Sequence, residues 1–210
     1  MSDKLLLQIA RCEEVSVALE DRNHPCHKIV TSQTTDGFQL PEPWNGNITS
    51  AEILFVGSNP SYNSAEFFPN QAWDNHKIAD FFRERFSDAY YKKIRFWSLI
   101  KKYAAWILDV PKNDPKLPEK ICITEIVHCK STREYGVRES CSICAQKWFQ
   151  QILDSFQGKY IVVLGMVAKK MLPEIPCEKK VLFMPHPNAR GVTDELRKVA
   201  LKEQLEEQSK

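Results

Sequence analysis

The sequence predicts a three-layer α/β/α fold, in which helices cover both faces of a central four-stranded parallel sheet. Four short apolar runs lack polar alternation, as expected of strands that are buried on both faces. Longer segments with helical spacing separate these runs, and this alternation favours parallel strands joined by right-handed crossovers. The 210 residues, 43% of them apolar, fit a single domain that spans residues 1–210.

The predicted elements follow one another in a regular order. Residues 1–50 are expected to hold a helix and then an irregular segment, because residues 31–49 are rich in Pro, Gly, Asn and Thr. The predicted strands are residues 51–56, 121–127, 160–164 and 181–184. The predicted helices are residues 77–86, 90–108, 137–156 and 193–206. We expect the charged tail, residues 202–210, to fray in solvent.

Composition sets loose bounds on function. The net charge of +2 permits DNA binding without arguing for it. No stretch approaches the roughly 20 apolar residues of a membrane span, and the first residues lack a signal-peptide core. We therefore expect a soluble monomer without a membrane partner, in the cytoplasm or, in a eukaryote, the nucleus. Seven cysteines in such a compartment favour metal binding or buried free thiols over disulfides.

Polar residues and chain breakers cluster where the predicted strands end. The first strand runs into residues 57–61 (Gly-Ser-Asn-Pro-Ser), the second into 128–131 (His-Cys-Lys-Ser) and the fourth into 185–191 (Pro-His-Pro-Asn-Ala-Arg-Gly). The carboxyl ends of parallel strands meet at one edge of a sheet, where active sites gather. These three loops are therefore expected to build one site.

Two of these loops resemble the signature motifs of the uracil-DNA glycosylase superfamily. Residues 57–61 are similar to the Gly-x-Asn-Pro-Gly motif of its mismatch-specific and single-strand-selective branches, with Ser61 replacing the last glycine. Residues 186–190 (His-Pro-Asn-Ala-Arg) resemble the second motif. The resemblance implies a uracil-DNA glycosylase-like fold. It also implies hydrolysis of the N-glycosidic bond of uracil or a related damaged base, the first step of base-excision repair.

The resemblance also implies roles for individual residues. Asn59 would orient the water that attacks the sugar C1′, and His186 would donate a hydrogen bond to the departing base, whose negative charge such donors stabilise. Arg190 would fill the gap left when a base is flipped out of the duplex. Two pairs of neighbours would complete the site: Gly57 and Ser58 against the base, and Ser61 and Asn188 against the DNA.

The family stacks the extruded base on an aromatic ring in the segment that follows the first motif. Two adjacent phenylalanines occupy that segment, and we select Phe68 for this role, with Phe67 as the second choice. Stacking of this kind contributes about 1–3 kcal/mol per base and tolerates different bases.

The second predicted strand departs from the family at Glu125. Most members carry there an Asn that reads the Watson–Crick edge of uracil. An ionised carboxylate accepts from uracil N3–H but repels O4. Three interpretations stay open: burial keeps Glu125 protonated so that it mimics the amide; Glu125 accepts from the exocyclic amine of a modified cytosine or purine; or it pairs with a nearby Lys or Arg.

The cysteines resemble those of the iron-sulfur branch, family 4. In that branch one Cys lies just past the base-reading strand, another starts the following helix, and two precede the first strand. The matching residues are Cys129, Cys144, Cys12 and Cys26. The resemblance implies a 4Fe-4S cluster held by these four thiolates, with a structural role.

Two features leave alternatives to that cluster open. Cys12 and Cys26 are more widely spaced than the family's Cys-x-x-Cys pair, and Cys141 forms a Cys-x-x-Cys with Cys144. Zinc held by Cys129, Cys141 and Cys144 is therefore an alternative, and unligated thiols are another.

Two classes of function remain. The first is a monofunctional DNA glycosylase, and the second is a non-catalytic, metal-containing nucleic-acid-binding protein of the same fold, which Glu125 keeps open. A flavodoxin-like or nucleotide-hydrolysing domain is disfavoured, because no glycine-rich phosphate loop follows the first strand.

Overall fold

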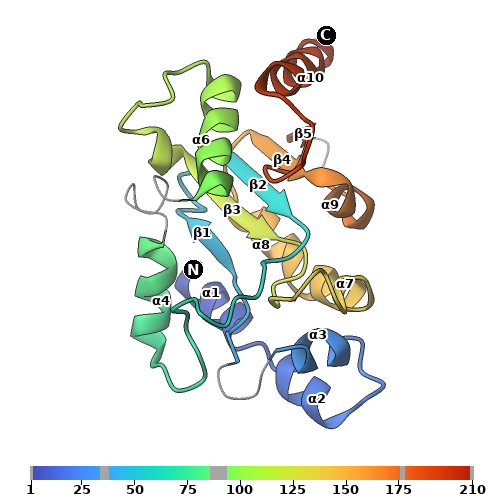
Figure 1. The fold of residues 1–210 in the computed structure, drawn as a ribbon. Helices are drawn as coiled ribbons and strands as arrows, with labels where there is room; N and C mark the ends of the chain where they lie inside the picture. Colours follow the sequence, from blue (N-terminus) through green and yellow to red (C-terminus); the bar gives the residue numbers. More distant parts are fainter. Residues whose placement is uncertain (1, 34–37, 86–93, 176–177, 209–210) are drawn as a thin grey trace.

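A computed structural model describes residues 2–33, 38–85, 94–175 and 178–208. Its centre is a five-stranded sheet with the strand order β1-β3-β2-β4-β5 (Figure 1). The strands are β1 (Trp44–Gly46), β2 (Ile53–Gly57), β3 (Ile121–Glu125), β4 (Tyr160–Leu164) and β5 (Lys180–Met184). All neighbouring pairs from β3 to β5 are parallel, which confirms the four predicted strands, whereas β1 runs antiparallel to β3.

Helices lie on both faces of this sheet. The α-helices are α1 (Ser2–Ala10), α2 (Glu14–Glu20), α3 (His27–Thr31), α4 (Asn75–Glu84), α6 (Arg95–Leu108), α7 (Val137–Cys144), α8 (Gln150–Ser155), α9 (Gly165–Met171) and α10 (Asp194–Glu207). A 3₁₀ turn, η2 (Leu117–Lys120), precedes β3, and a π-helical turn, η3 (Ala145–Phe149), joins α7 to α8. In the described part of the chain, no helix is long and apolar enough to cross a membrane.

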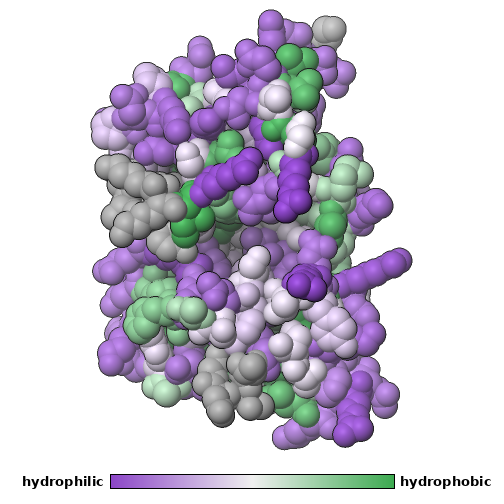
Figure 2. All heavy atoms as spheres, in the orientation of Figure 1, coloured by the Kyte–Doolittle hydropathy of each residue, from purple (hydrophilic) through white to green (hydrophobic). Residues whose placement is uncertain are grey.

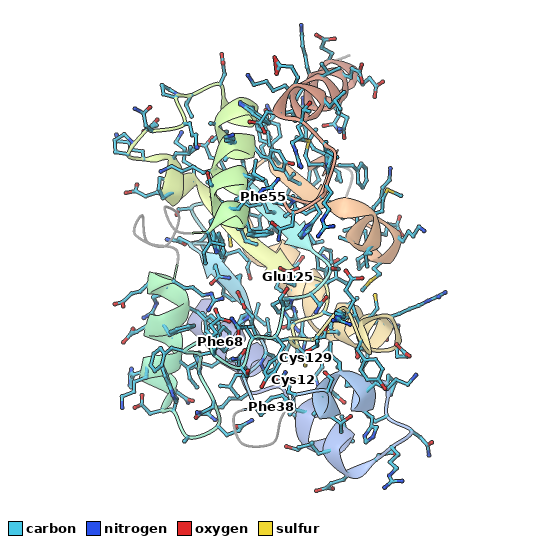
Figure 3. The ribbon with its side chains drawn as sticks, in the orientation of Figure 1. Cys12, Phe38, Phe55, Phe68, Glu125 and Cys129 are labelled. Carbon is cyan, nitrogen blue, oxygen red and sulfur yellow. The ribbon has the colours of Figure 1, made fainter. Side chains whose placement is uncertain are left out.

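Two hydrophobic clusters enclose the sheet. Successive side chains of β2 point to opposite faces, so Ile53 and Phe55 pack against α6 and α10 (Figure 3). Leu54 and Val56 pack on the other face with α1, α4 and α8. A third, smaller cluster joins α2 and α3 to α7 and to the segment after β3. The two large clusters give the three-layer α/β/α arrangement that the sequence predicts.

The strand β1 corrects the prediction of an irregular segment over residues 31–49. It pairs with β3 so that Asn45 lies opposite Ile123. The strand is three residues long and follows Pro43, so it lacks the apolar run that marks the other strands. Its place at the edge of the sheet suits a segment that begins next to a proline.

The helices also differ in part from the prediction. Residues 77–86 and 90–108 correspond to α4 and α6, although residues 86 and 90–93 fall outside the described residues. Residues 137–156 correspond to α7, η3 and α8 together. The short helix α9 was not predicted. Gly165 has a positive φ of 84° and begins this helix, so the chain turns directly from β4 into α9 without a loop.

Residues 202–207 of the charged tail do not fray as predicted, because α10 continues to Glu207, whereas residues 209–210 of that prediction lie outside the described residues. Gln204 explains this result. Its side-chain oxygen accepts from the Phe183 N–H at 2.7 Å, and its Nε2 donates to the Phe183 carbonyl at 3.0 Å. The amide of Gln204 thus satisfies backbone groups on the outer edge of β5, in the way that a neighbouring strand would.

Candidate active site

One cleft of about 350 Å³ lies at the carboxyl ends of β2, β3 and β5, and β1 and the start of α6 complete its wall. The surface is hollowed near the centre of the face shown in Figure 2. A cleft of this volume is at the lower end of the range for small-molecule sites. Most of the predicted site residues line it: Gly57, Ser58, Asn59, Ser61, Glu125, His186 and Asn188.

The loop after β2 is fixed against the chain that follows β3. Ser131 N–H donates to the Pro60 carbonyl at 3.1 Å, and Val127 N–H donates to the Ser58 carbonyl at 3.0 Å. Asn59 donates from Nδ2 to the Pro60 carbonyl at 2.9 Å and to Ser131 Oγ at 2.7 Å. Because both amide protons of Asn59 are engaged, its Oδ1 is the atom left to accept a hydrogen bond from water.

His186 follows β5 on the opposite wall of the cleft. Its Nδ1 accepts from the Asn188 N–H at 3.2 Å, so the proton of the neutral ring is on Nε2. Burial lowers the pKa of His186; the charge of Glu134 opposes this shift and that of Arg197 reinforces it. At neutral pH, His186 is therefore an uncharged ring with an Nε2–H donor.

The loop that carries His186 is held from beneath by Arg197 of α10, whose side chain is almost completely buried. Its guanidinium donates to the Tyr103 hydroxyl, which in turn donates to the Pro185 carbonyl at 2.9 Å. It also contacts four loop carbonyls at 3.3–3.5 Å, those of Pro185, His186, Ala189 and Val192. Arg197 thus fixes the backbone of residues 185–192.

Glu125 lies at the end of β3, with its carboxyl group over Gly57. A Cβ on Gly57 would collide with this carboxyl group, so a larger residue at position 57 would displace the side chain of Glu125. The Oε2 atom of Glu125 is buried and has no hydrogen-bond partner among the described residues. Burial, and then the charge of Glu42, raise the pKa of Glu125 well above its usual range. These surroundings favour the protonated form of Glu125, which is the first of the three interpretations.

Other polar residues in the cleft wall were not selected from the sequence. Lys130 donates to Glu66 Oε2 at 2.6 Å, and Arg85 pairs with Glu66 Oε1 at 2.8 Å. Lys130 immediately follows the predicted ligand Cys129, so its place in the second loop could have drawn attention to it. Glu42 and Asn45 carried no such signal, because they come from β1 and the residues before it, which were not predicted to join the sheet.

Phe68 does not lie where the sequence analysis expected it. Only 5% of its surface is exposed, and the Lys130 ammonium lies 3.5 Å from its ring centroid, so a base cannot stack there unless Lys130 moves. Phe67 is 77% exposed and also lies outside the cleft wall. Phe96, in the first turn of α6, does line the cleft, with its ring 5.7 Å from that of His186. It was missed because only the segment after the first motif was considered.

Arg190 is exposed on the loop between β5 and α10, outside the wall of the cleft. Ser61 and Asn188 are also exposed, at the rim. These three side chains thus face solvent beside the cleft, where a bound polymer could reach them.

The four predicted cysteine ligands line one narrow cavity, although they come from four separate segments. Cys12 follows α1, Cys26 precedes α3, Cys129 follows β3 and Cys144 ends α7. Figure 3 shows Cys12 and Cys129 near each other, next to the end of β3. The backbone N–H of His128 lies 3.4 Å from Cys144 Sγ and donates to it.

The thiols of this cavity interact with one another. Burial raises the pKa of Cys26 to about 11, and the neighbouring Cys12 adds to the shift. Burial also raises the pKa of Cys129 and Cys144. Cys141 does not line the cavity, and its thiol points to the Met171 carbonyl at 3.7 Å. Within the described ranges, no three His, Cys, Asp or Glu side chains form a group that could hold a single metal ion.

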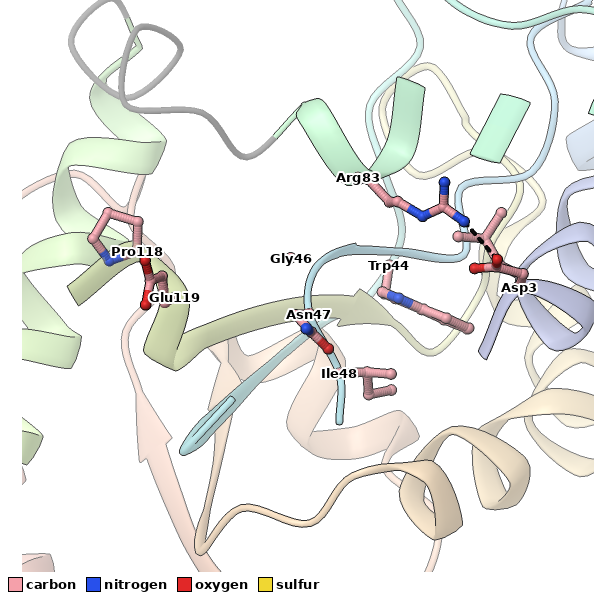
Figure 4. A pocket seen from close by; sticks show the side chains of 9 residues that line it. Asp3, Trp44, Gly46, Asn47, Ile48, Arg83, Pro118 and Glu119 are labelled. Atoms are coloured by element: carbon pink, nitrogen blue, oxygen red, sulfur yellow. Dashed lines mark hydrogen bonds and ion pairs between the residues drawn. The ribbon is translucent and has the colours of Figure 1, made fainter. Parts of the chain in front are cut away.

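A second cavity, of about 360 Å³, lies away from the motif loops (Figure 4). Trp44, Asn47 and Ile48 form part of its wall, and the ion pair between Arg83 and Asp3 crosses its rim. It contains none of the residues selected from the sequence, and we assign it no role.

Comparison with known proteins identifies the family of the chain. A family model described as the uracil DNA glycosylase superfamily matches residues 43–208, which include both motif loops and the whole sheet from Trp44 onward. A search of curated proteins found no match to the sequence.

Proposed function

Because this chain belongs to the uracil DNA glycosylase superfamily, we propose that it is a monofunctional DNA glycosylase that hydrolyses the N-glycosidic bond of uracil or a related damaged base. One observation carries the proposal: Asn59, Glu125 and His186, which come from the ends of three different strands, line the same cleft. The enzyme works as a monomer where the cell keeps its DNA, in the cytoplasm or in the nucleus of a eukaryote.

Asn59 directs the nucleophile in this proposal. Its Nδ2 is engaged by Pro60 and Ser131, so Oδ1 accepts a hydrogen bond from the attacking water and turns a water lone pair toward C1′. The water oxygen bonds to C1′ as the bond to the base breaks, and the base leaves with the bonding electron pair. The water gives up a proton to solvent, and the base anion takes one up from solvent, so the products are an abasic sugar hydroxyl and the neutral base. The DNA strand is left uncut, with an abasic sugar.

His186 stabilises the departing base. Its Nε2–H donates to a carbonyl oxygen of the base, where the negative charge collects as the bond breaks. A neutral donor suits this task, because the lowered pKa of His186 favours the uncharged ring at neutral pH. The ring of Phe96, beside His186, offers the stacking surface that Phe68 does not.

Glu125 reads the edge of the base in its protonated form. Its O–H donates to a carbonyl oxygen and its C=O accepts from a ring N–H, which is the hydrogen-bonding pattern of an amide. Ser61, Asn188 and Arg190 contact the DNA strand around the extruded nucleotide, and Arg190 fills the vacated place in the duplex.

We further propose that Cys12, Cys26, Cys129 and Cys144 hold a 4Fe-4S cluster. The support is chemical and spatial: four soft donors line one cavity, and an amide N–H points at one of them. A bound cluster would supply a structural cross-link between the N-terminal helices and the segment after β3. Zinc is the weaker candidate, because a single ion needs three or four ligands around one point, and Cys141 lies outside the cavity.

The alternative is a nucleic-acid-binding protein of the same fold that has lost base release. The position of Lys130 favours it, because this ammonium covers the Phe68 ring on which the family stacks the base. In that case the protein binds DNA and the cleft takes no base.

Base release from duplexes that carry uracil, hypoxanthine, xanthine or a thymine mismatch separates the two functions. If the chain is an enzyme, Asn59→Ala and His186→Ala each lower the rate of release about 10²–10³-fold. DNA affinity, measured on the same duplexes, stays within about threefold of the native value because neither side chain anchors the backbone. Asn47→Ala, an exposed residue outside the cleft, serves as the control. If the native protein releases none of the four bases but binds the duplexes, the non-catalytic function is correct.

A further inference from the structure

Besides Glu125 Oε2, two buried acceptor atoms in the wall of the cleft have no hydrogen-bond partner among the described residues, and neither belongs to one of the motif loops. They are Asn45 Oδ1 and Glu42 Oε2. Asn45 is 2% exposed and Glu42 is 6% exposed, and both residues line the cleft. A buried acceptor without a donor costs free energy, and buried polar groups usually find a partner in the protein or in a ligand.

Asn45 lies on the same face of the sheet as Glu125. Asn45 is opposite Ile123 in the antiparallel pair of β1 and β3, and Ile123 and Glu125 are two residues apart on β3. Side chains in such a diagonal relation are neighbours on one face. The unpartnered oxygen of Asn45 and the carboxylic acid of Glu125 therefore border the same part of the cleft.

The orientation of the Asn45 amide is fixed by Glu42. Asn45 Nδ2 donates to Glu42 Oε1 at 2.5 Å, so Oδ1 is turned the other way. Glu42 is itself anchored, because its backbone N–H donates to the His128 carbonyl at 2.8 Å. Arg85 Nε lies 3.6 Å from the same carboxylate. The oxygen of Asn45 is thus a rigid acceptor that cannot exchange places with its own NH₂ group.

A rigid acceptor supplies a discrimination between bases that Glu125 alone does not provide. A neutral carboxylic acid can carry its proton on either oxygen, so it matches an edge with a ring N–H beside a carbonyl and also one with a ring nitrogen beside an amine. Glu125 alone therefore cannot separate uracil-like from cytosine-like bases. A neighbouring atom that can only accept removes this ambiguity at the position it faces.

We propose that Asn45 is the specificity-determining residue of the base pocket: its Oδ1 and the carbonyl oxygen of Glu125 share the ring N–H of the base, while the O–H of Glu125 donates to the adjacent carbonyl oxygen. Glu42 is the positioning residue that sets the direction of the Asn45 amide. The substrates are then bases with an imide-type edge, in which N–H adjoins C=O, such as uracil, hypoxanthine and xanthine. Cytosine and adenine are excluded. This inference rests on the proposed function, because it assigns the base pocket of that same site.

Binding of free bases tests the inference without requiring base release. Dissociation constants for uracil, cytosine, hypoxanthine and adenine are measured by NMR titration of the native protein and of Asn45→Leu, which is similar in size to Asn. We expect the native protein to bind uracil and hypoxanthine more tightly than cytosine and adenine. In Asn45→Leu this preference falls about tenfold, because the imide N–H loses the acceptor that cannot also donate and keeps only the ambiguous carboxylic acid of Glu125. Asn47→Leu, on the neighbouring cavity (Figure 4), keeps the native preference.

Variants of Glu42 test the positioning role. Glu42→Gln keeps a carbonyl oxygen that accepts from Asn45 Nδ2, so it retains the native preference, whereas Glu42→Ala loses it as Asn45→Leu does. Thermal unfolding of each variant shows whether the fold is kept.

Several results would overturn the inference. One is an unchanged preference in Asn45→Leu, and another is an equal loss of affinity for all four bases, which indicates a structural role only. If the native protein binds cytosine more tightly than uracil, the pocket does not recognise an imide-type edge, and that assignment is wrong. A failure of the proposed function gives a different result from a failure of this inference. In that case the native protein releases no base from DNA, whatever its preference among free bases.

Discussion

At position 125 a carboxyl group replaces the amide that most of the superfamily uses, and the surroundings of Glu125 determine its chemical form. Its Oε2 is buried, no positive charge pairs with it among the described residues, and the nearby Glu42 opposes a second negative charge. Residue type alone left three interpretations of Glu125 open, because burial and neighbouring charge are set by the fold and not by the residue.

The raised pKa of Glu125 predicts a loss of stability as the pH rises. In the unfolded chain this carboxyl releases its proton near pH 4.5, whereas in the folded chain it keeps the proton to higher pH. The folded state thus binds more protons above pH 4.5, so the free energy of unfolding decreases as the pH rises toward the folded pKa. Glu125→Gln cannot ionise, and its stability relative to the native protein should increase from pH 4 to pH 8 in urea denaturation. Parallel profiles for the two proteins would contradict a buried, protonated Glu125.

The same side chain predicts a pattern of activity. Glu125→Gln presents a fixed amide of nearly the same length, so its rate of uracil release should stay within about fivefold of the native rate at pH 6. Glu125→Ala removes both hydrogen bonds and should release uracil about 10²-fold more slowly. Single-turnover assays on one duplex measure both. If Glu125→Ala releases uracil at the native rate, Glu125 takes no part in base recognition.

At the scale of elements, the loop that carries His186 depends on two helices that come from distant parts of the sequence. Arg197 of α10 and Tyr103 of α6 bind the carbonyls of this loop, and Arg197 is buried without a carboxylate partner among the ion pairs of the described residues. The motif at residues 186–190 could be found from sequence, since its residues are contiguous. Its support could not, because the packing of α6 beside α10 brings Tyr103 and Arg197 together.

Replacement of the Arg197 guanidinium, which contacts several loop carbonyls at once, should lower the rate of base release more than the affinity for DNA. Arg197→Lys keeps a positive charge but loses the planar guanidinium that contacts several carbonyls. We therefore expect kcat for base release to fall about 10–100-fold, whereas DNA affinity stays within about threefold of the native value. Arg197→Met also removes the charge that helps to lower the pKa of His186, so that pKa should rise in an NMR titration. Lys202→Met, an exposed substitution on the same helix, is the control. If both Arg197 variants keep the native kcat, Arg197 does not position His186.

Sequence patterns were most reliable for strands that form a continuous apolar run, including β5 at one edge of the sheet, and least reliable for segments without such a run. The strands β2 to β5 were predicted because each is a continuous apolar run. The edge strand β1 and the end of α10 were misjudged because their structure depends on particular pairings, such as Gln204 with Phe183, that leave no periodic pattern. The same limit hid Asn45, which reaches the cleft only because β1 joins the sheet.

At the scale of the whole molecule, the cysteine cavity and the base cleft share one stretch of chain. His128 and Cys129 line the cavity, whereas Glu125 and Lys130 line the cleft. Glu42 joins the two sites, because His128 Nδ1 donates to its carbonyl at 2.8 Å while its carboxylate lies in the cleft wall. A metal centre that fixes residues 128–129 would therefore also hold the wall of the base pocket.

The proposed cluster predicts a coloured protein whose stability depends on four of its cysteines. Protein purified without oxygen should be brown, with about four iron and four sulfide per chain. Cys129→Ser and Cys144→Ser should each abolish the colour and lower the midpoint of thermal unfolding by about 5–10 °C, as expected when about 2–3 kcal/mol of stabilisation is lost in a chain of this size. Cys141→Ser is the matched control, since Cys141 lies one turn from Cys144 on α7 but outside the cavity, and it should keep both colour and stability. A colourless protein that binds one zinc, and loses it in Cys141→Ser, would replace the cluster with the zinc site.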